Sequence, residues 1–226
     1  MKFGSINKKR IFSAAALFLL VILAFCVVYG ETTQKEIADN VVRLHIVANS
    51  DSPFDQDVKL EVRDAILAHM RTQYPDGATR EEAAHYLKNS LPEIERISAE
   101  VLRENGSDEP VRAKYGEFPF PTREYGDITL PAGRYEAVRV ELGQAKGQNW
   151  WCVMFPPLCV ADANSLGLDE QAMKQLRDEL GSENYGLITD IADRSNVPVK
   201  IKFRIIEIVE NSRTQLAELL SHLFCT

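Results

Sequence analysis

The chain has 226 residues, 45% of them hydrophobic and 26% charged, a composition that suits one globular domain of about 150–200 residues with a small additional segment. Four of the 26 basic residues and none of the 33 acidic residues lie in the first thirty positions, so the remainder carries 22 basic and 33 acidic side chains, a net charge of -11. A body this acidic repels phosphate groups and anionic lipid, and the sequence has no basic patch with interleaved aromatic residues, which argues against nucleic-acid binding.

Residues 1–30 have the pattern of a secretory signal or a membrane anchor. The basic run 8–10 precedes the apolar run 11–28, in which Ser13 is the only clearly polar residue. The apolar run is near the length that spans a bilayer, so cleavage after Gly30 and retention as an uncleaved anchor are both open. Because the cations precede the apolar run, either outcome keeps the amino end on the inner side of the membrane and places the chain beyond residue 30 on the outer side.

The next predicted element is a strand at 41–48, which is mostly apolar and therefore expected in the centre of a sheet. Ser52 and Pro53 have the residue types of a helix N-cap and a first helical position. The helix that they open is expected to end by residues 75–77. It places one apolar stripe on the core: Phe54, Val58, Val62, Ala65 or Ile66, and Met70.

A second helix is predicted from Thr79, since Thr79 and Glu82 match a capping box. Pro92 removes one backbone donor within the helical pattern that follows. Ser90 can cap a new start, so we expect a kinked helix or two abutting helices that end near residues 105–106.

Beyond residue 106 the apolar residues alternate, which predicts three strands: 111–115, 135–142 and 149–155. Residues 118–121 are expected to form an extended loop and residues 130–133 a turn. Residues 143–147 are expected to form the loop of a hairpin between the last two strands.

The strand at 149–155 contains both tryptophans of the chain. Its alternation places Trp150, Cys152 and Met154 on one face, and Trp151, Val153 and Phe155 on the other. Both faces are apolar, so this strand is either central or leaves one adhesive face exposed.

Residues 161–226 carry weaker patterning, with a helix near 168–180, a long strand at 199–210 and a last helix capped by Asn211 or Ser212. One strand, several helices and then a run of strands predict an α+β fold. We expect a mixed or antiparallel sheet with helices packed on one face, preceded by an N-terminal signal or anchor helix.

The expected parts are a signal peptide or membrane anchor at residues 1–30, a core α+β domain at residues 31–160, and a C-terminal extension at residues 161–226. The extension is expected to hold a helix, a strand and the terminal helix.

Cys152 and Cys159, with six residues between them, are the main candidates for side-chain chemistry. In an exported protein a disulfide is favoured, and it would fix the turn at Pro156 and Pro157. Two buried free thiols, a metal half-site and a nucleophile paired with His45 remain alternatives, although a metal site needs more than two ligands.

Two further groups have both a structural and a functional interpretation. His45 lies in the middle of a strand, where a buried histidine with satisfied hydrogen bonds is the structural account. Asp51, Asp55 and Asp57 form an acidic cluster that could bind calcium, but it lacks the glycine and the distal glutamate of a known calcium loop. Helix capping accounts for Asp51 and Asp55, so we predict no metal site there. We also predict no catalytic residue, cofactor or small-molecule substrate.

Four blocks between residues 40 and 160 are distinctive: Val42–Ser52 with Asp55–Asp64, Phe118–Gly126, Leu130–Ala137, and Gly147–Cys159. In their residues and in their order they resemble the stage II sporulation protein R family. Residues 161–226 carry no motif that matches.

The resemblance implies a signal rather than an enzyme. Proteins of this family are made in the forespore of endospore-forming bacteria and exported into the space between the two membranes. There they activate a membrane-embedded aspartic protease of the mother cell, which cleaves the precursor of sigma-E. By this resemblance the protein meets the membrane through residues 11–28 at least before cleavage, and it stays membrane-associated if that segment is kept.

Aromatic residues dominate protein contacts, so the expected protease-binding residues are Trp151, Phe155, Pro156 and Pro157, with burial in the core as the alternative. The competing function is an extracytoplasmic hydrolase or thiol protein that uses Cys152 and His45.

Overall fold

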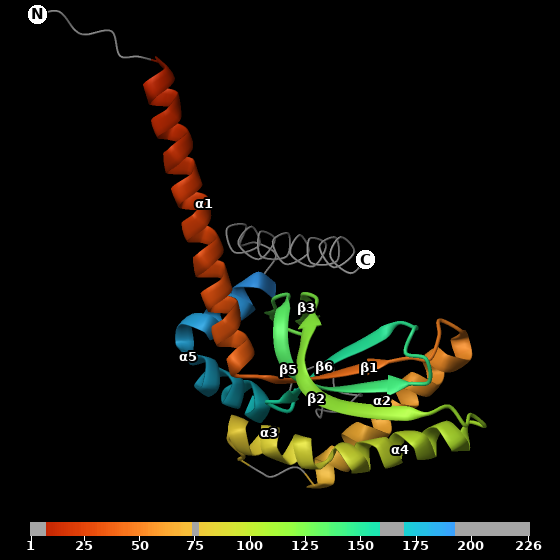
Figure 1. Ribbon diagram of the computed structural model, residues 1–226. Helices are drawn as coiled ribbons and strands as arrows, with labels where there is room; N and C mark the ends of the chain where they lie inside the picture. The colour runs from red at the N-terminus through yellow and green to blue at the C-terminus, as the bar shows by residue number, and fades with distance from the viewer. Residues whose placement is uncertain (1–7, 74–76, 159–169, 193–226) are drawn as a thin grey trace, which may run out of the picture.

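The computed structural model describes residues 8–73, 77–158 and 170–192, and it has a four-stranded sheet with helices on both sides (Figure 1). A long helix, α1 (Lys8–Asp39), leads into the sheet and projects away from the rest of the molecule. Large apolar side chains between residues 12 and 29 are exposed, whereas Ile37 is fully buried. Among the residues described, a search for a helix with the length and apolar character needed to cross a membrane finds none. The signal or anchor role of residues 1–30 therefore stays a prediction.

The central sheet has the order β2 (Val111–Phe120), β5 (Gly133–Leu142), β1 (Val42–Val47) and β6 (Asn149–Phe155). Strand β1 runs parallel to β5 and antiparallel to β6, so the sheet is mixed and the predicted α+β class is confirmed. All six residues of β1 are buried, as a nearly continuous apolar sequence predicts for a central strand.

The predicted hairpin between β5 and β6 is wrong, because β1 lies between those two strands. The hairpin prediction considered only neighbours in the chain, whereas β1 offers an apolar strand that pairs along both of its edges. The β5–β6 connection instead folds over the end of β1, where the Gly147 amide donates to the Ala48 carbonyl. The loop predicted at 118–121 is also mostly strand, since β2 continues to Phe120.

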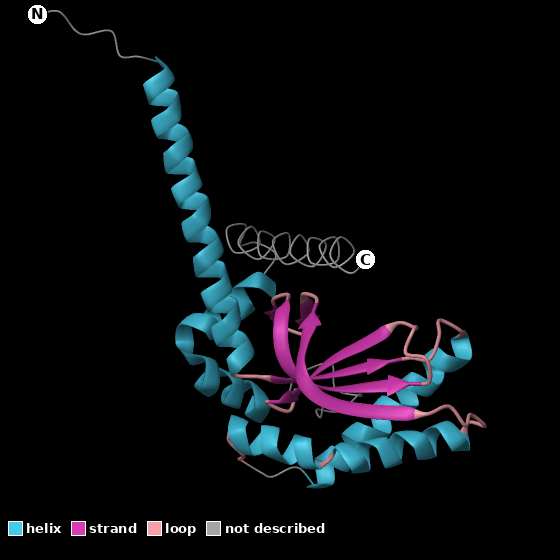
Figure 2. Cartoon of the chain, viewed as in Figure 1, coloured by secondary structure: helices cyan, strands magenta, loops and turns pink. Residues whose placement is uncertain are grey.

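Three helices cover one face of the sheet: α2 (Pro53–Gln73), α3 (Arg80–Asn89) and α4 (Leu91–Glu104). Helices α3 and α4 lie below the strands in Figure 2. Their buried side chains pack on Leu44 and Ile46 of β1 to form the first core. Helices α3 and α4 abut rather than form one kinked helix.

The capping predictions for α2 and α3 are confirmed, whereas the prediction that Ser90 caps α4 is wrong, because its hydroxyl donates to the Tyr86 carbonyl instead of accepting from the first turn of α4. The Asp55 amide donates to the Ser52 hydroxyl over 3.1 Å, and Thr79 and Glu82 make both bonds of a capping box. In the predicted stripe of α2, Phe54 is the exception, because its side chain is 50% exposed. The first turn of α2 is hydrogen-bonded to Asn49 and its neighbours at the end of the sheet, which keeps Phe54 away from the first core.

Helices also contribute to a second core on the opposite face of the sheet. The last turns of α1, helix α5 (Glu170–Ala192) and the hairpin of β3 (Arg123–Tyr125) and β4 (Ile128–Leu130) pack there against Ala137 and Val153. The prediction of helices on one face only is therefore wrong. Periodicity identifies an amphipathic helix but does not say which face of a sheet the helix covers.

Helix α5 matches the helix expected near residues 168–180 and continues past a kink at Gly181, whose φ of 72° is left-handed. Its buried residues belong to the same core as the last turns of α1. The strand expected at 199–210 and the terminal helix lie outside the described residues, and the division at residues 30 and 160 stays a prediction.

Strand β6 alternates as predicted over most of its length. Cys152 and Met154 face the first core, whereas Trp151 and Val153 face the second. Phe155 differs, because it packs in the first core rather than the second. A register shift against β1 inserts one extra residue into β6 at this point, and such a bulge changes the face of the residue that follows.

Candidate functional site

Arg43 of β1 is a fully buried cation in the second core. The centre of its guanidinium lies 4.2 Å from the centre of the Phe120 ring and 5.0 Å from that of Tyr135. One terminal nitrogen donates to the Tyr125 hydroxyl, and Nε donates to the Cys152 carbonyl over 3.3 Å. The other terminal nitrogen, Nη1, has no hydrogen-bond partner among the residues that the structure describes. Burial lowers the pKa of Arg43, yet a guanidinium keeps its charge in proteins, so a positive charge lies beneath this face of the sheet.

His45 lies on the same face, two residues further along β1. Its ring stacks on Trp151 with 3.9 Å between ring centres, and Phe120 meets it edge-on. The ring Nε2 is 2.7 Å from the Asn149 side-chain oxygen. Desolvation lowers the pKa of His45 to about 4, which keeps the ring neutral at neutral pH. His45 is buried, as the structural account predicts, but its hydrogen bonds are only partly satisfied, since Nδ1 has no partner among the described residues.

Beyond Arg43 and His45 this face becomes accessible, and we call that part the open face. Strand register assigns to it Arg112, Lys114 and Phe118 of β2, Arg139 and Glu141 of β5, and Asn149 and Trp151 of β6. Helices α1 and α5 pack at the other end of the face, and the aromatic members of the open face keep part of their surface exposed.

Contacts within the open face join its charges to its aromatic rings. The Arg139 guanidinium centre is 5.6 Å from the centre of the Phe118 ring. Glu141 pairs with Lys114 at 2.9 Å and with Arg139 at 3.0 Å. These pairs lower the pKa of Glu141, the hydrogen bond from Lys114 contributing most. The Glu141 carboxylate therefore forms ion pairs with two cations, Lys114 and Arg139.

The four residues predicted to bind the protease fall into two groups. Phe155 is 0% exposed and Pro156 is buried, so neither presents a surface to a partner in this conformation. Trp151 and Pro157 are partly exposed, and of the two Trp151 belongs to the open face. Their role in binding stays a prediction.

The structure does not bring Cys152 and His45 together as a catalytic pair. Cys152 is opposite Leu44 and faces the first core, whereas His45 faces the second. Cys152 is also disulfide-bonded, and a disulfide leaves no thiolate to act as a nucleophile. The Cys152–His45 pair on which the hydrolase alternative depends is therefore not formed in this structure. Cys159 lies outside the described residues, so its pairing with Cys152 stays a prediction.

Two loops interlock at the end of β1. The Asn49 side-chain oxygen accepts a hydrogen bond from the backbone N–H of Gln144 over 2.9 Å. The Asp51 carboxylate accepts one from the backbone N–H of Gln148 over 2.8 Å. Gly147 lies so close to Ser50 that a Cβ there would be 2.2 Å from the Ser50 carbonyl oxygen. These residues hold two loops together, which accounts for Asp51 without calcium.

Asp55 has a similar structural role, since it accepts hydrogen bonds from Ser50 and Asn49 at the start of α2. These bonds lower the pKa of Asp55, the bond from Ser50 contributing most. In the described part of the chain, no group of three or more His, Cys, Asp or Glu side chains could hold a metal ion.

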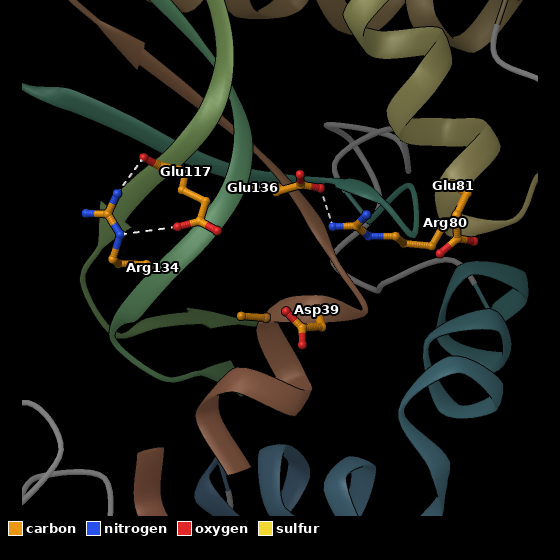
Figure 3. Close-up of a pocket in the computed structure, with 7 residues that line it drawn as sticks. Asp39, Arg80, Glu81, Glu117, Arg134 and Glu136 are labelled. Carbon is orange, nitrogen blue, oxygen red and sulfur yellow. Dashed lines mark hydrogen bonds and ion pairs between the residues drawn. The ribbon is translucent and has the colours of Figure 1, made fainter. Parts of the chain in front are cut away.

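A polar cavity of about 370 Å³ lies between the end of α1, the start of α3 and strands β2 and β5 (Figure 3). Glu117 and Glu136 are directly opposite each other on those strands, an arrangement that repels. Arg80 reaches from α3 to Glu136, and Arg134 bonds Glu117, so each carboxylate has its own cation. We interpret this cavity as a site of charge compensation between α3 and the edge of the sheet.

Comparison with known proteins identifies the family. The family model described as stage II sporulation protein R (spore_II_R) matches residues 38–165, which include every described strand. The chain belongs to this family. It is also similar to Stage II sporulation protein R of Bacillus subtilis (strain 168), with 38% identity over 176 residues that cover 74% of this chain and 79% of that protein. No solved structure matches.

Membership of the stage II sporulation protein R family gives the protein a role in sporulation. The structure also explains two of the blocks that carried the resemblance. The block Val42–Ser52 supplies β1 and one interlocking loop, and the block Gly147–Cys159 begins in the other loop and continues as β6.

Sequence reasoning missed most of the open face. Arg43 is a single charge within an apolar strand, and nothing local indicates that it is buried among aromatic rings. Lys114 and Phe118 share a face through the alternation of β2, a signal that the sequence does contain. Their position beside Arg139 and Trp151 depends on strand order, which alternation does not reveal.

Proposed function

We propose that this protein is an exported sporulation signal that activates a membrane-embedded aspartic protease, which then processes the sigma-E precursor. The observation that carries the proposal is membership of the stage II sporulation protein R family. The protein acts here as a ligand, and the peptide-bond chemistry belongs to the protease.

Export is supported by the sequence of the amino terminus. The basic run 8–10 and the apolar run 11–28 have the charge order that sends the body out of the forespore into the intermembrane space. Until cleavage, or permanently without it, residues 11–28 hold the protein at the membrane.

Contact with the protease is proposed to occur through the open face. Trp151 is the predicted contact residue that has both exposed surface and a place on this face. Arginine and aromatic residues are enriched at the centres of interfaces, and Arg139 and Phe118 adjoin each other here. Pro157 is the second exposed candidate, whereas Phe155 and Pro156 support the fold from within.

The experiment is complementation of Bacillus subtilis cells that lack their own stage II sporulation protein R. The full chain is expressed in the forespore, and conversion of the sigma-E precursor is followed by immunoblot. We expect conversion to be restored by the full chain and lost when residues 1–30 are removed, because the shortened chain is not exported.

A chain that accumulates outside the forespore and leaves the precursor uncut would contradict the proposed function. Immunoblots for the protein itself, before and after fractionation, distinguish that result from poor expression. Sequencing the mature amino terminus in the same cells decides between cleavage after Gly30 and retention of the anchor.

A further inference from the structure

We propose that the open face binds an extended acidic segment of a partner protein, with an apolar side chain of that segment packed on Trp151 and Phe118. If the proposed function is correct, the segment belongs to the outward-facing part of the protease. The chemistry of recognition depends on the open face alone.

The open face is positively charged on an acidic protein. It carries Arg112, Lys114 and Arg139 against the single carboxylate of Glu141, whereas the chain beyond residue 30 has a net charge of -11. The Lys114 side chain is 53% exposed and that of Arg139 is 28% exposed, so both can pair with a ligand. A local patch of one sign attracts the opposite sign and steers its approach.

The buried guanidinium of Arg43 adds to this charge from below. Within the described residues its hydrogen-bond partners are the Tyr125 hydroxyl and the Cys152 carbonyl, and its Nη1 has none, so no carboxylate there neutralises it by a hydrogen bond. Charges in a low-dielectric interior act over longer distances than charges in water. His45 contributes no charge, because its lowered pKa of about 4 leaves it neutral.

The spacing of the cations favours an extended ligand. Arg112 and Lys114 are two residues apart on β2, which separates them by about 6–7 Å along the strand. Carboxylates at every second position of an extended peptide repeat at the same distance. Phe118 lies four residues beyond Lys114 on β2, and Trp151 lies in the same cross-strand row as Lys114 and Arg139. Both rings offer partly exposed aromatic surface for an apolar side chain of such a peptide.

A protein segment fits better than a membrane surface or a second copy of the chain. A bilayer of anionic lipid would attract the open face but repel the rest of the acidic body. A second copy would have to bring its own cationic face near this one in a symmetric dimer, which costs repulsion between like charges. The experiment below can still detect binding to a membrane surface or to a second copy of the chain.

The first test uses the purified full chain and two capped peptides. One has glutamate at two alternate positions and phenylalanine at the next alternate position, so that all three side chains share one face of the extended peptide, and the other has glutamine in place of glutamate. Binding is followed by fluorescence of Trp151 in a Trp150→Phe background. We expect the glutamate peptide to bind at least about tenfold more tightly at low salt, an advantage that shrinks as ionic strength rises.

Two charge reversals supply the matched comparison. Lys114→Glu reverses a charge on the open face, whereas Arg103→Glu reverses the charge of another exposed cation, on α4. Lys114→Glu should weaken binding of the glutamate peptide about tenfold, and Arg103→Glu should leave it unchanged. Equal binding of both peptides, or no effect of Lys114→Glu, overturns the proposal. So does binding to vesicles of anionic lipid, or self-association, if Lys114→Glu abolishes it.

The second test applies the same variants to sigma-E precursor conversion in the complemented cells. Restoration by the unaltered chain and by Arg103→Glu, with loss in folded Lys114→Glu, supports both proposals. Restoration by all three retains the proposed function and overturns the role of the open face in it. If the unaltered chain restores nothing, the proposed function fails, and the peptide titration alone decides whether the open face binds acidic segments.

Discussion

Replacing His45 with glutamine should remove a pH dependence from the stability of the fold. The histidine is neutral in the folded protein, with its pKa lowered to about 4, and it gains a proton near pH 6.5 when the chain unfolds. A group whose folded pKa is lowered stabilises the fold above the unfolded pKa, and that stability is lost as pH falls from about 6.5 to about 4. Between pH 7 and pH 5 this single group should cost about 2 kcal/mol of the free energy of unfolding.

The assay is urea denaturation followed by far-ultraviolet circular dichroism at pH 7 and at pH 5. His45→Gln keeps an amide that can bond Asn149, and it should lose about 2 kcal/mol less than the unaltered protein between the two pH values. His85→Gln, at an exposed position on α3, should keep the original pH dependence. Equal losses in the unaltered protein and in His45→Gln would refute the assignment of this dependence to the buried ring.

Three further changes test the fold through the free energy of unfolding measured by urea denaturation at pH 7. Gly147→Ala should destabilise by about 1–3 kcal/mol, because its Cβ would meet the Ser50 carbonyl oxygen at 2.2 Å, and an unchanged midpoint would contradict the interlocking of the two loops. Thr79→Ala should cost about 1 kcal/mol through loss of the capping box with Glu82, and no loss would mean that the box does not stabilise α3. Arg43→Met should be neutral or stabilising by about 1–4 kcal/mol, since it removes a buried charge without a carboxylate partner while keeping volume. A loss of several kcal/mol in Arg43→Met would instead show that the aromatic rings and neutral oxygen atoms compensate the charge fully.

Local signals in the sequence were sufficient for much of the first core. The apolar run of β1 indicates a buried strand, and the cap residues Ser52 and Thr79 mark where α2 and α3 begin. These features depend on residues within one helical turn or one strand of each other, so the sequence expresses them directly.

Strand order and the choice of sheet face could not be obtained in this way. The position of β1 between β5 and β6 depends on pairing between segments about a hundred residues apart. The face of Phe155 depends on a one-residue register shift, and the burial of Arg43 depends on aromatic rings from β2, β3 and β5. The open face is built from these long-range arrangements, which is why only Trp151 of its members was predicted.

The central place of β1 determines when the fold can be completed. Arg43 on β1 and Cys152 on β6 are 109 residues apart, and in the proposed export the residues just after the apolar run 11–28 cross the membrane before those nearer the carboxyl end. The strand that appears first on the far side must therefore wait, with both edges unpaired, until β5 and β6 have followed it. Meanwhile α2, α3 and α4 depend on local contacts and can form early. If the chain is exported as proposed, the open face forms only after residue 155 has crossed, so an incompletely exported chain cannot present it.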